Sequence, residues 1–451
     1  MLSGSVMKGL VVIAIPVMVM NVLQILFNIA DMTILKIYDT DGGYSVGAVG
    51  VCSTLITLIT GLMIGTAVGV NIVVAKYIGK GDNDGVDKTI GSAIIFALIG
   101  GAVLVLIGVC FAEVFLRLIS CPESLLKSAA LYFRMYFYGV PLLLLYNFFS
   151  AILRSAGDSK RPMIYLTIGG AIKIGFTFLF VGVFRMTIVG VALSTIISWA
   201  ISASLMGIAL FFNKGAVKLK FSKLRLYGKQ LKEFLLVGVP TGMQQALYSI
   251  ANVVITAAVN GFGEDATTGV SIANQFDSIL YYISIAPSLA VMPYVSQNVG
   301  AQNMGRIRET LLKGIVFTIV LGASFGALSA IFSTQLSSIM SDNPAIIAYS
   351  RQKMVIISST YFIMGISEVL GATLKGLGRP IIPMICTLIF MCAIRFPWVY
   401  LIFPLYQNLT FLYLIWPIGW TFSIIVLLFF LIITMKETEK IFKISNVETH
   451  V

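Results

Sequence analysis

The chain has 451 residues, of which 58% are hydrophobic and only 11% are charged, and its mean hydropathy is +0.97. Soluble domains carry about 25% charged residues, so this composition excludes a water-soluble globule and indicates an integral membrane protein. The single histidine, His450, is the penultimate residue. We therefore expect no histidine-based catalysis, metal site or proton relay within the membrane, and no cofactor.

Two further features of the composition concern processing and redox state. The first apolar run, at about residues 10–30, is long enough to span a bilayer and lacks a small-residue cleavage site, so we expect no cleavable signal peptide. The five cysteines show neither CxxC nor metal-ligand spacing. We expect them to act as apolar filler without a disulfide.

The net charge of +12 is unevenly distributed along the chain. Of the 31 lysines and arginines, 22 fall in one set of alternate polar segments and two, Lys173 and Arg395, lie within apolar runs. The other alternate segments hold Lys36, Arg117, Lys127, Arg134, Arg185, Arg351 and Lys353. This asymmetry follows the positive-inside rule, so it predicts an even number of spans with both termini in the cytoplasm, and no nucleic-acid partner.

Twelve apolar stretches of spanning length follow one another, centred near residues 20, 62, 103, 141, 173, 200, 245, 284, 324, 360, 392 and 423. The longest polar connection lies almost at the midpoint of the chain. We predict an N-lobe of six spans at residues 1–213, a cytoplasmic linker at 214–232, a C-lobe of six spans at 233–435 and a cytoplasmic tail at 436–451. No Walker A motif is present, so ATP is not the expected energy source.

The two halves of the sequence resemble each other. Pro16 and Pro240 open spans 1 and 7, and Lys173 and Arg395 occupy matching places in spans 5 and 11, at offsets of 224 and 222 residues. An even shift of six spans makes this a parallel repeat. The predicted fold is an all-α membrane protein with twelve helices as two pseudo-symmetric six-helix bundles around a central cavity, which favours a transporter over a duplicated scaffold or channel.

Five motifs, in order, resemble those of multidrug and toxic compound extrusion (MATE) transporters. Residues 27–31 read FNIAD, residues 190–198 read GVALSTIIS, and residues 240–245 read PTGMQQ. Residues 297–302 read QNVGAQ and are followed by Arg306 and Ile307, and residues 374–378 read LKGLG. The likeness extends from about residue 8 to residue 435 and is greatest to the prokaryotic DinF-like branch.

This resemblance implies a monomeric antiporter of the plasma membrane. It would export amphiphilic, often cationic, small molecules by alternating access of its two lobes, driven by an inward gradient of H⁺ or Na⁺. The family's coupling carboxylate corresponds to Asp31, with Asn28 and Thr195 nearby in its motifs. An ionised carboxylate within an apolar span is costly, by about 2.5–3.5 kcal/mol, which supports a role in proton uptake over a cap at the lipid interface.

Span 5 departs from the family pattern. The DinF-like branch carries an Asn and an Asp here that help to bind a cation, whereas this chain has Lys173 and Thr177. An ammonium group cannot bind Na⁺ and repels it. We therefore predict that Lys173 replaces the cation by pairing with Asp31; the alternative is that Lys173 extends to an interface.

A second group of polar residues is expected to line the substrate cavity. Glu368 lies near the middle of span 10 and Asn147 occupies the matching place in span 4. Glu368 would attract a cationic substrate or carry a second proton, or it would form a structural ion pair with Arg395. The set is completed by Asp277, Gln245 and Gln275, whose amides serve helix packing in the alternative interpretation.

Two other functions remain open from the sequence. A flippase for lipids or lipid-linked oligosaccharides on a related fold would favour a strongly cationic cavity, whereas the intramembrane charges here are mixed. A membrane enzyme or receptor would need a catalytic cluster or a soluble sensor domain, and the sequence contains neither pattern.

Overall fold

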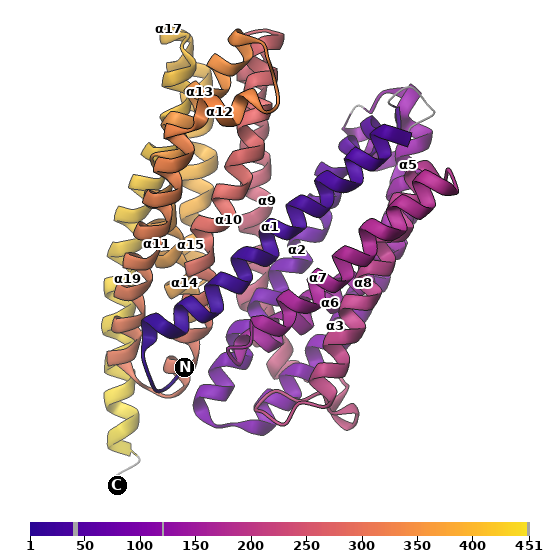
Figure 1. Cartoon of the computed structure of the whole chain (residues 1–451). Coiled ribbons are helices and arrows are strands. Elements are labelled where there is room, and N and C mark those ends of the chain that lie inside the picture. Colours follow the sequence, from indigo (N-terminus) through magenta and orange to yellow (C-terminus); the bar gives the residue numbers. More distant parts are fainter. Residues whose placement is uncertain (39–43, 120, 449–451) are drawn as a thin grey trace. The chain divides into compact units, whose positions relative to one another are not determined.

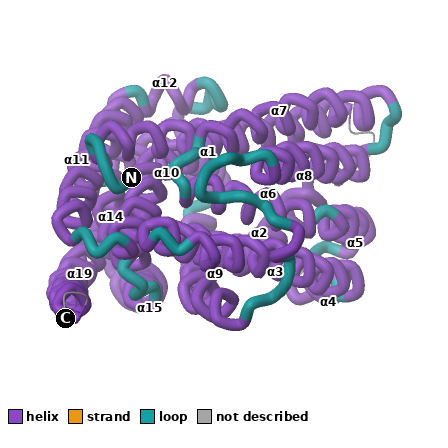
Figure 2. The backbone as a smooth tube through the Cα atoms, turned by 90° about the horizontal axis from the view of Figure 1, so that it is seen from below, coloured by secondary structure: helices purple, strands orange, loops and turns teal. Residues whose placement is uncertain are grey.

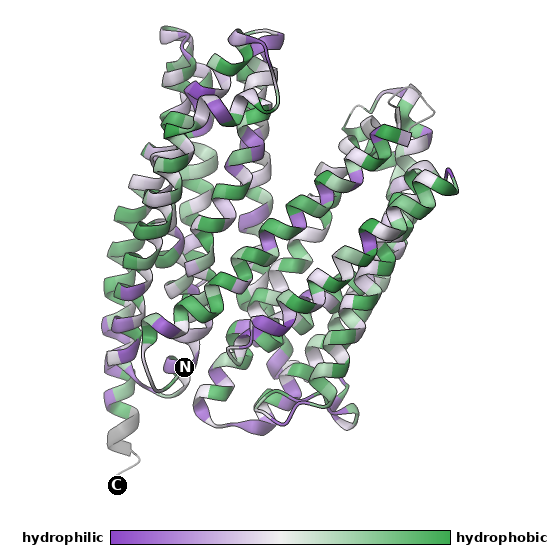
Figure 3. Cartoon of the chain, viewed as in Figure 1, coloured by the Kyte–Doolittle hydropathy of each residue, from purple (hydrophilic) through white to green (hydrophobic). Residues whose placement is uncertain are grey.

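The computed structural model of the chain describes residues 1–38, 44–119 and 121–448. These residues form helices and connecting loops, and the described part contains no strand (Figure 2). Apolar side chains dominate the long helices, and hydrophilic ones concentrate towards their ends and in the loops (Figure 3). The all-α membrane fold predicted from the composition is confirmed.

The first half of the chain forms helices α1 to α8, most of which are labelled in Figure 1. They are α1 (Val6–Tyr38), α2 (Tyr44–Lys80), α3 (Asn83–Cys110), α4 (Ala112–Leu118), α5 (Glu123–Tyr138), α6 (Val140–Ser155), α7 (Lys160–Thr177), the π-helix η1 (Phe178–Val183) and α8 (Thr187–Phe211). The linker contains one turn of 3₁₀-helix, η2 (Phe221–Lys223).

The second half repeats this order. Its long helices are α9 (Gly228–Asn260), α10 (Glu264–Gly300) and α11 (Met304–Ile331), followed by α12 (Ser333–Ser338), α13 (Pro344–Ser358) and α14 (Tyr361–Gly376). The eleventh span is made of α15 (Ile381–Cys386), η3 (Thr387–Ala393), α16 (Arg395–Pro397), η4 (Trp398–Ile402) and α17 (Phe403–Tyr406). The last comprises α18 (Leu409–Tyr413) and α19 (Ile415–Glu448).

Twelve segments of the described chain have the length of a membrane span. Nine are long and apolar enough by themselves, and the pairs α5/α6 and α13/α14 become two more if each bent pair is one span. The twelfth is α9, which has 33 residues but is less apolar because it carries Gln244, Gln245 and Asn252. The number of spans therefore agrees with the sequence prediction.

The two bent spans are related by the repeat. The axis of the chain turns by 46° between α5 and α6 and by 45° between α13 and α14. The first bend lies at Gly139, two residues before Pro141 in the first turn of α6. Proline is well accommodated in the first turn of a helix and removes a backbone donor to the preceding turn, which favours a break at this point.

The chain forms two compact units. The C-terminal unit comprises Met1–Met18 and Met243–Val451, and the N-terminal unit comprises Val19–Gly242. Helices α1 and α9 each pass from one unit to the other two residues after a proline, Pro16 and Pro240, respectively. The linker at 214–232 thus belongs to the N-terminal unit. The compact units also differ from the halves of the sequence repeat, because the beginning of α1 belongs to the C-terminal unit and the beginning of α9 to the N-terminal unit.

The linker is tied to the start of α3. Lys220 forms an ion pair with Asp87 at 2.5 Å and Lys223 with Asp84 at 2.9 Å, and the backbone N–H of Tyr227 donates to a side chain of α3. The hydrogen bond to Asp84 raises the pKa of the Lys223 ammonium above its usual value. These contacts fix the linker against the N-terminal unit.

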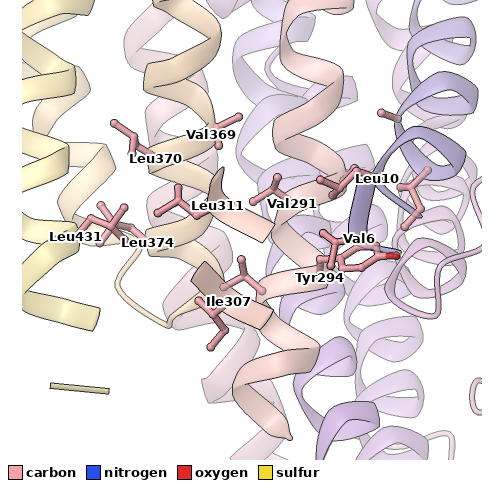
Figure 4. Close-up of a cluster of buried hydrophobic side chains, with 14 of the residues drawn as sticks. Val6, Leu10, Val291, Tyr294, Ile307, Leu311, Val369, Leu370, Leu374 and Leu431 are labelled. Atoms are coloured by element: carbon pink, nitrogen blue, oxygen red, sulfur yellow. The ribbon is translucent and has the colours of Figure 1, made fainter. Parts of the chain in front are cut away.

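The core of the C-terminal unit includes the beginning of α1. Val6 and Leu10 of α1 are fully buried and join a cluster with Val291 and Tyr294 of α10 (Figure 4). The guanidinium of Arg306, at the start of α11, donates to the carbonyl of Met1 at 2.9 Å. Because Arg308 of the same turn pairs with Glu439 of α19 at 2.5 Å, the two termini of the chain lie at the same end of this unit.

Candidate functional site

A buried ion pair joins the first and fifth spans within the N-terminal unit. The ammonium of Lys173 lies 2.5 Å from Oδ2 of Asp31, and the two residues are only 7% and 3% exposed. The structure thus brings together the two residues that the sequence predicted as a pair. Two charges buried in this way compensate each other, and removing either would leave an unpaired charge in a medium of low dielectric constant.

Hydroxyl groups complete the surroundings of the carboxylate. Thr177 donates to Oδ1 of Asp31 at 2.9 Å, and its oxygen is 2.7 Å from the hydroxyl of Ser194. Ser194 in turn donates to the carbonyl of Val191 in α8 at 2.9 Å. Both carboxylate oxygens therefore have a partner, one an ammonium and the other a hydroxyl.

The local sequence of α7 explains why these groups converge. Lys173 and Thr177 are four residues apart and so lie on one face of the helix. Gly170, one turn earlier, allows α7 to approach α1 closely, because a Cβ atom there would lie 1.9 Å from the ring of Phe27. Directly after Thr177 the backbone changes to the π-helix η1, a feature found often at functional sites.

The other polar residues predicted for the N-lobe make local contacts. Asn28 is exposed on α1, one turn before Asp31. Thr195 donates to the carbonyl of Val191 at 2.8 Å, and Asn147 donates to the carbonyl of Leu143 at 2.8 Å. The hydroxyl that joins the carboxylate network from α8 is that of Ser194, next to the predicted Thr195.

The C-terminal unit contains a cavity of about 410 Å³. Helices α9, α10, α13, α14, α18 and α19 supply its walls. Seven aromatic side chains line it: Tyr248, Tyr281, Tyr282, Tyr361, Tyr413, Trp416 and Trp420. Its volume and its mixture of aromatic walls with a few polar groups are typical of a small-molecule site.

One ion pair lies in the wall of this cavity. Lys353 of α13 is 2.9 Å from Oδ2 of Asp277 of α10 and also donates to the side-chain oxygen of Asn274. The side chains of Lys353 and Asp277 are only 6% and 13% exposed. Asp277, which was predicted in the cavity, lines it. Lys353, which was expected in a loop, lies within α13 and is 4% exposed.

The remaining cavity candidates separate in the structure. Gln245 lines the cavity. Gln275 is exposed and does not line it; the neighbouring Asn274 does. Arg395 does not pair with Glu368. It is 1% exposed, donates to Asn252 at 2.8 Å and lies over the ring of Trp416.

Glu368 is half-buried in α14, one turn beyond the cavity residue Met364, and is not among the described residues that line the cavity. Its charge nevertheless acts on Tyr248 and Tyr281, which line the cavity, and its role in attracting a cationic substrate stays a prediction.

Comparison with known proteins identifies the family. The model of the MatE family matches the chain twice, at residues 16–179 and 240–401, which also reproduces the internal repeat. The chain is 26% identical to the probable multidrug resistance protein YoeA of Bacillus subtilis (strain 168) over 402 residues, 87% of this chain and 86% of YoeA. It is 28% identical to the probable multidrug resistance protein YpnP of the same organism over 396 residues, 88% of each chain.

The fold is shared with solved transporters. An outward-facing multidrug resistance MATE family transporter of the MOP superfamily superposes with a TM-score of 0.90 at 21% identity, over 97% of this chain and 98% of that one. The same values are found for a MOP superfamily transporter from Pyrococcus furiosus Vc1. The family match and the names of the curated relatives, both multidrug resistance proteins, favour neither an enzyme nor a lipid flippase. The chain belongs to the MatE family of multidrug efflux transporters.

Proposed function

We propose that this protein is a proton-coupled antiporter that exports amphiphilic organic compounds, with Asp31 and Lys173 as the coupling pair. The observation that carries the proposal is the 2.5 Å contact between the Lys173 ammonium and the Asp31 carboxylate. Na⁺ needs a set of oxygen ligands, and here the position of the cation beside the carboxylate is taken by a tethered positive charge. Na⁺ could bind beside Asp31 only against the electrostatic repulsion of the Lys173 ammonium.

Protonation of Asp31 provides the coupling step. A neutral carboxyl group no longer compensates Lys173, so the buried ammonium is left with a large desolvation cost. That cost drives a rearrangement of α7 relative to α1. The rearranged state persists until the proton leaves Asp31 on the opposite side of the membrane. The π-helix η1 directly follows this part of α7 and offers a place for a local change of helical register.

The orientation and assembly follow from the same reasoning. The excess of basic residues in one set of alternate segments supports a plasma-membrane protein with both termini in the cytoplasm. The two termini at one end of the C-terminal unit agree with an even number of spans. Since one chain supplies both halves of the repeat, a monomer is sufficient for alternating access.

The test is transport in proteoliposomes under separately imposed gradients of H⁺ and Na⁺. Efflux of a fluorescent amphiphile should respond to the proton gradient alone, and Asp31→Asn should abolish the response. Glu264→Gln, at an exposed carboxylate in the first turn of α10, is the matched control and should transport normally.

A second variant addresses the missing sodium site directly. Lys173→Asn removes the tethered cation and supplies an amide oxygen, so proton coupling should be lost. Transport driven by Na⁺ in the wild-type protein, unchanged in Lys173→Asn, would overturn the proposal.

A further inference from the structure

We propose that the cavity of the C-terminal unit binds flat aromatic compounds that carry an anionic group. Its aromatic lining explains the aromatic part of this ligand. Tyr281 and Tyr282 lie on α10 and Trp416 lies on α19, so two separate helices contribute rings to the same cavity. Aromatic faces bind flat rings by offset stacking, with little loss of conformational freedom in the protein.

The preference for an anion comes from the hydrogen-bond donors around the cavity. Lys353 in the wall has three N–H donors, of which two are directed to Asp277 and Asn274. The hydroxyl of Tyr413, which lines the cavity, is buried without a hydrogen-bond partner among the described residues. A lining group of this kind is best satisfied by a ligand that supplies acceptors.

Arg395 acts on the cavity through two of its lining residues. Its Nη1 donates to Asn252 at 2.8 Å and its guanidinium centre lies 5.0 Å from the ring centroid of Trp416. A guanidinium over one face of Trp416 draws electron density towards itself. It therefore adds a positive field to a cavity whose only lining charges, among the described residues, are those of the Lys353–Asp277 pair.

The available carboxylates are poor partners for a cationic ligand. Asp277 is already bound to Lys353, so a cation that took its place would leave Lys353 unpaired beside a second positive charge. Glu368 lies outside the wall, and although its charge reaches Tyr248 and Tyr281 of the cavity, it is countered by the charge of Lys375 two turns later in the same helix. An anionic group, by contrast, can share or replace Asp277 on Lys353 while the displaced carboxylate, which is partly exposed, is solvated.

This inference rests on the proposed export function for its biological meaning, but binding is measurable without a gradient. The probes are 1-pyrenebutyrate and 4-(1-pyrenyl)butyltrimethylammonium, which share the ring system and differ in charge. Trp416 and Trp420 in the wall serve as energy donors to bound pyrene in zwitterionic-lipid nanodiscs. A Trp416→Phe/Trp420→Phe variant lacks these two donors, so the pyrene fluorescence that remains with it measures the background from probe dissolved in lipid.

The wild-type protein should bind the anionic probe at least tenfold more tightly than the cationic one. Asp277→Asn should retain or strengthen this preference, because it frees Lys353. The double variant Lys353→Gln/Asp277→Asn keeps two groups that can hydrogen-bond to each other and avoids an unpaired charge, so it should fold. It should bind both probes within threefold of each other.

Tighter binding of the cationic probe, or an unchanged preference in the double variant, would overturn the inference. The failure of the coupling proposal gives a different result: the anionic probe still binds, and Asp31→Asn transports as well as the wild-type protein. If the coupling proposal is right and the binding site is wrongly assigned, the wild-type protein still shows proton-driven efflux, and the variant Lys353→Gln/Asp277→Asn keeps the wild-type preference between the two probes.

Discussion

Asp31 and Lys173 form a buried ion pair in the N-terminal unit. Thr177 adds a hydrogen bond to the carboxylate at 2.9 Å and links it to Ser194 of α8. A hydrogen bond to an ionised group contributes about 1.5–3 kcal/mol. The hydroxyl of Thr177 thereby helps to hold the carboxylate in place beside Lys173.

Replacing Thr177 with Val should lower the rate of proton-driven efflux. The change keeps the shape of the side chain but removes the donor to Asp31, so the carboxylate loses one of its two partners and the coupling pair is held less firmly. Thr195→Val is the matched control, because Thr195 donates to the carbonyl of Val191 in its own helix. The control should keep the wild-type rate; equal losses in the two variants would contradict a specific role for Thr177.

The charged residues also show how far sequence reasoning reaches. The Asp31–Lys173 contact was predictable because both residues occupy motif positions on apolar spans. The Asp277–Lys353 contact was missed because Lys353 lies at the less apolar end of a bent span and resembled a loop residue. A recognisable signal was Pro344, a favourable first residue for a helix, which indicates that the span begins well before Lys353.

At the level of elements, close helix contacts decide the position of the coupling pair. Helix α7 approaches α1 at Gly170, where a Cβ atom would lie 1.9 Å from the ring of Phe27. Five residues later, Gly175 has no heavy atom within 4 Å of its ideal Cβ position. The same helix thus offers one glycine that is required by packing and one that is not.

Substituting Ala at these two glycines should have opposite effects on thermal stability. Gly170→Ala forces Phe27 to move and should cost about 1–3 kcal/mol, as overpacking does. Gly175→Ala should be neutral or stabilising by up to about 1 kcal/mol, because alanine is the better helix former. Thermal unfolding in detergent measures both, and equal melting temperatures would show that the α1–α7 contact is looser than the structure indicates.

The elements that sequence reasoning did not predict are those without a strong local signal. Nine of the spans follow from length and hydropathy alone in the described chain. The π-helices η1, η3 and η4 arise from hydrogen-bond register within spans and leave the apolar pattern unchanged. The bend at Gly139 had a signal in the nearby Pro141, but its counterpart between Ser358 and Tyr361 has no proline to indicate it.

For the whole molecule, the exchange of helix beginnings makes the two units interdependent. The C-terminal unit needs residues 1–18, and the N-terminal unit needs the part of α9 that precedes Met243. Val6 and Leu10 are fully buried in the core of the C-terminal unit, so their loss would open that core. Neither half of the sequence repeat therefore contains a complete compact unit.

Co-expressed fragments 1–215 and 216–451 should assemble into a transport-competent complex, whereas each fragment alone should be degraded. The cut falls in the exposed turn at Gly215, and both compact units then draw on both chains. Co-purification through a tag on one fragment measures assembly. A second pair that omits residues 1–18 is the control and should fail to assemble; stable recovery of either fragment by itself would contradict the interdependence.

The same exchange bears on the origin of the repeat. A single six-helix copy would have a first helix whose beginning, up to its proline, finds no binding surface within that copy. Two identical copies could satisfy this need by each lending its first helical turns to the other. Two separate copies would therefore have to exchange their first helical turns, as the single chain does after Pro16 and Pro240.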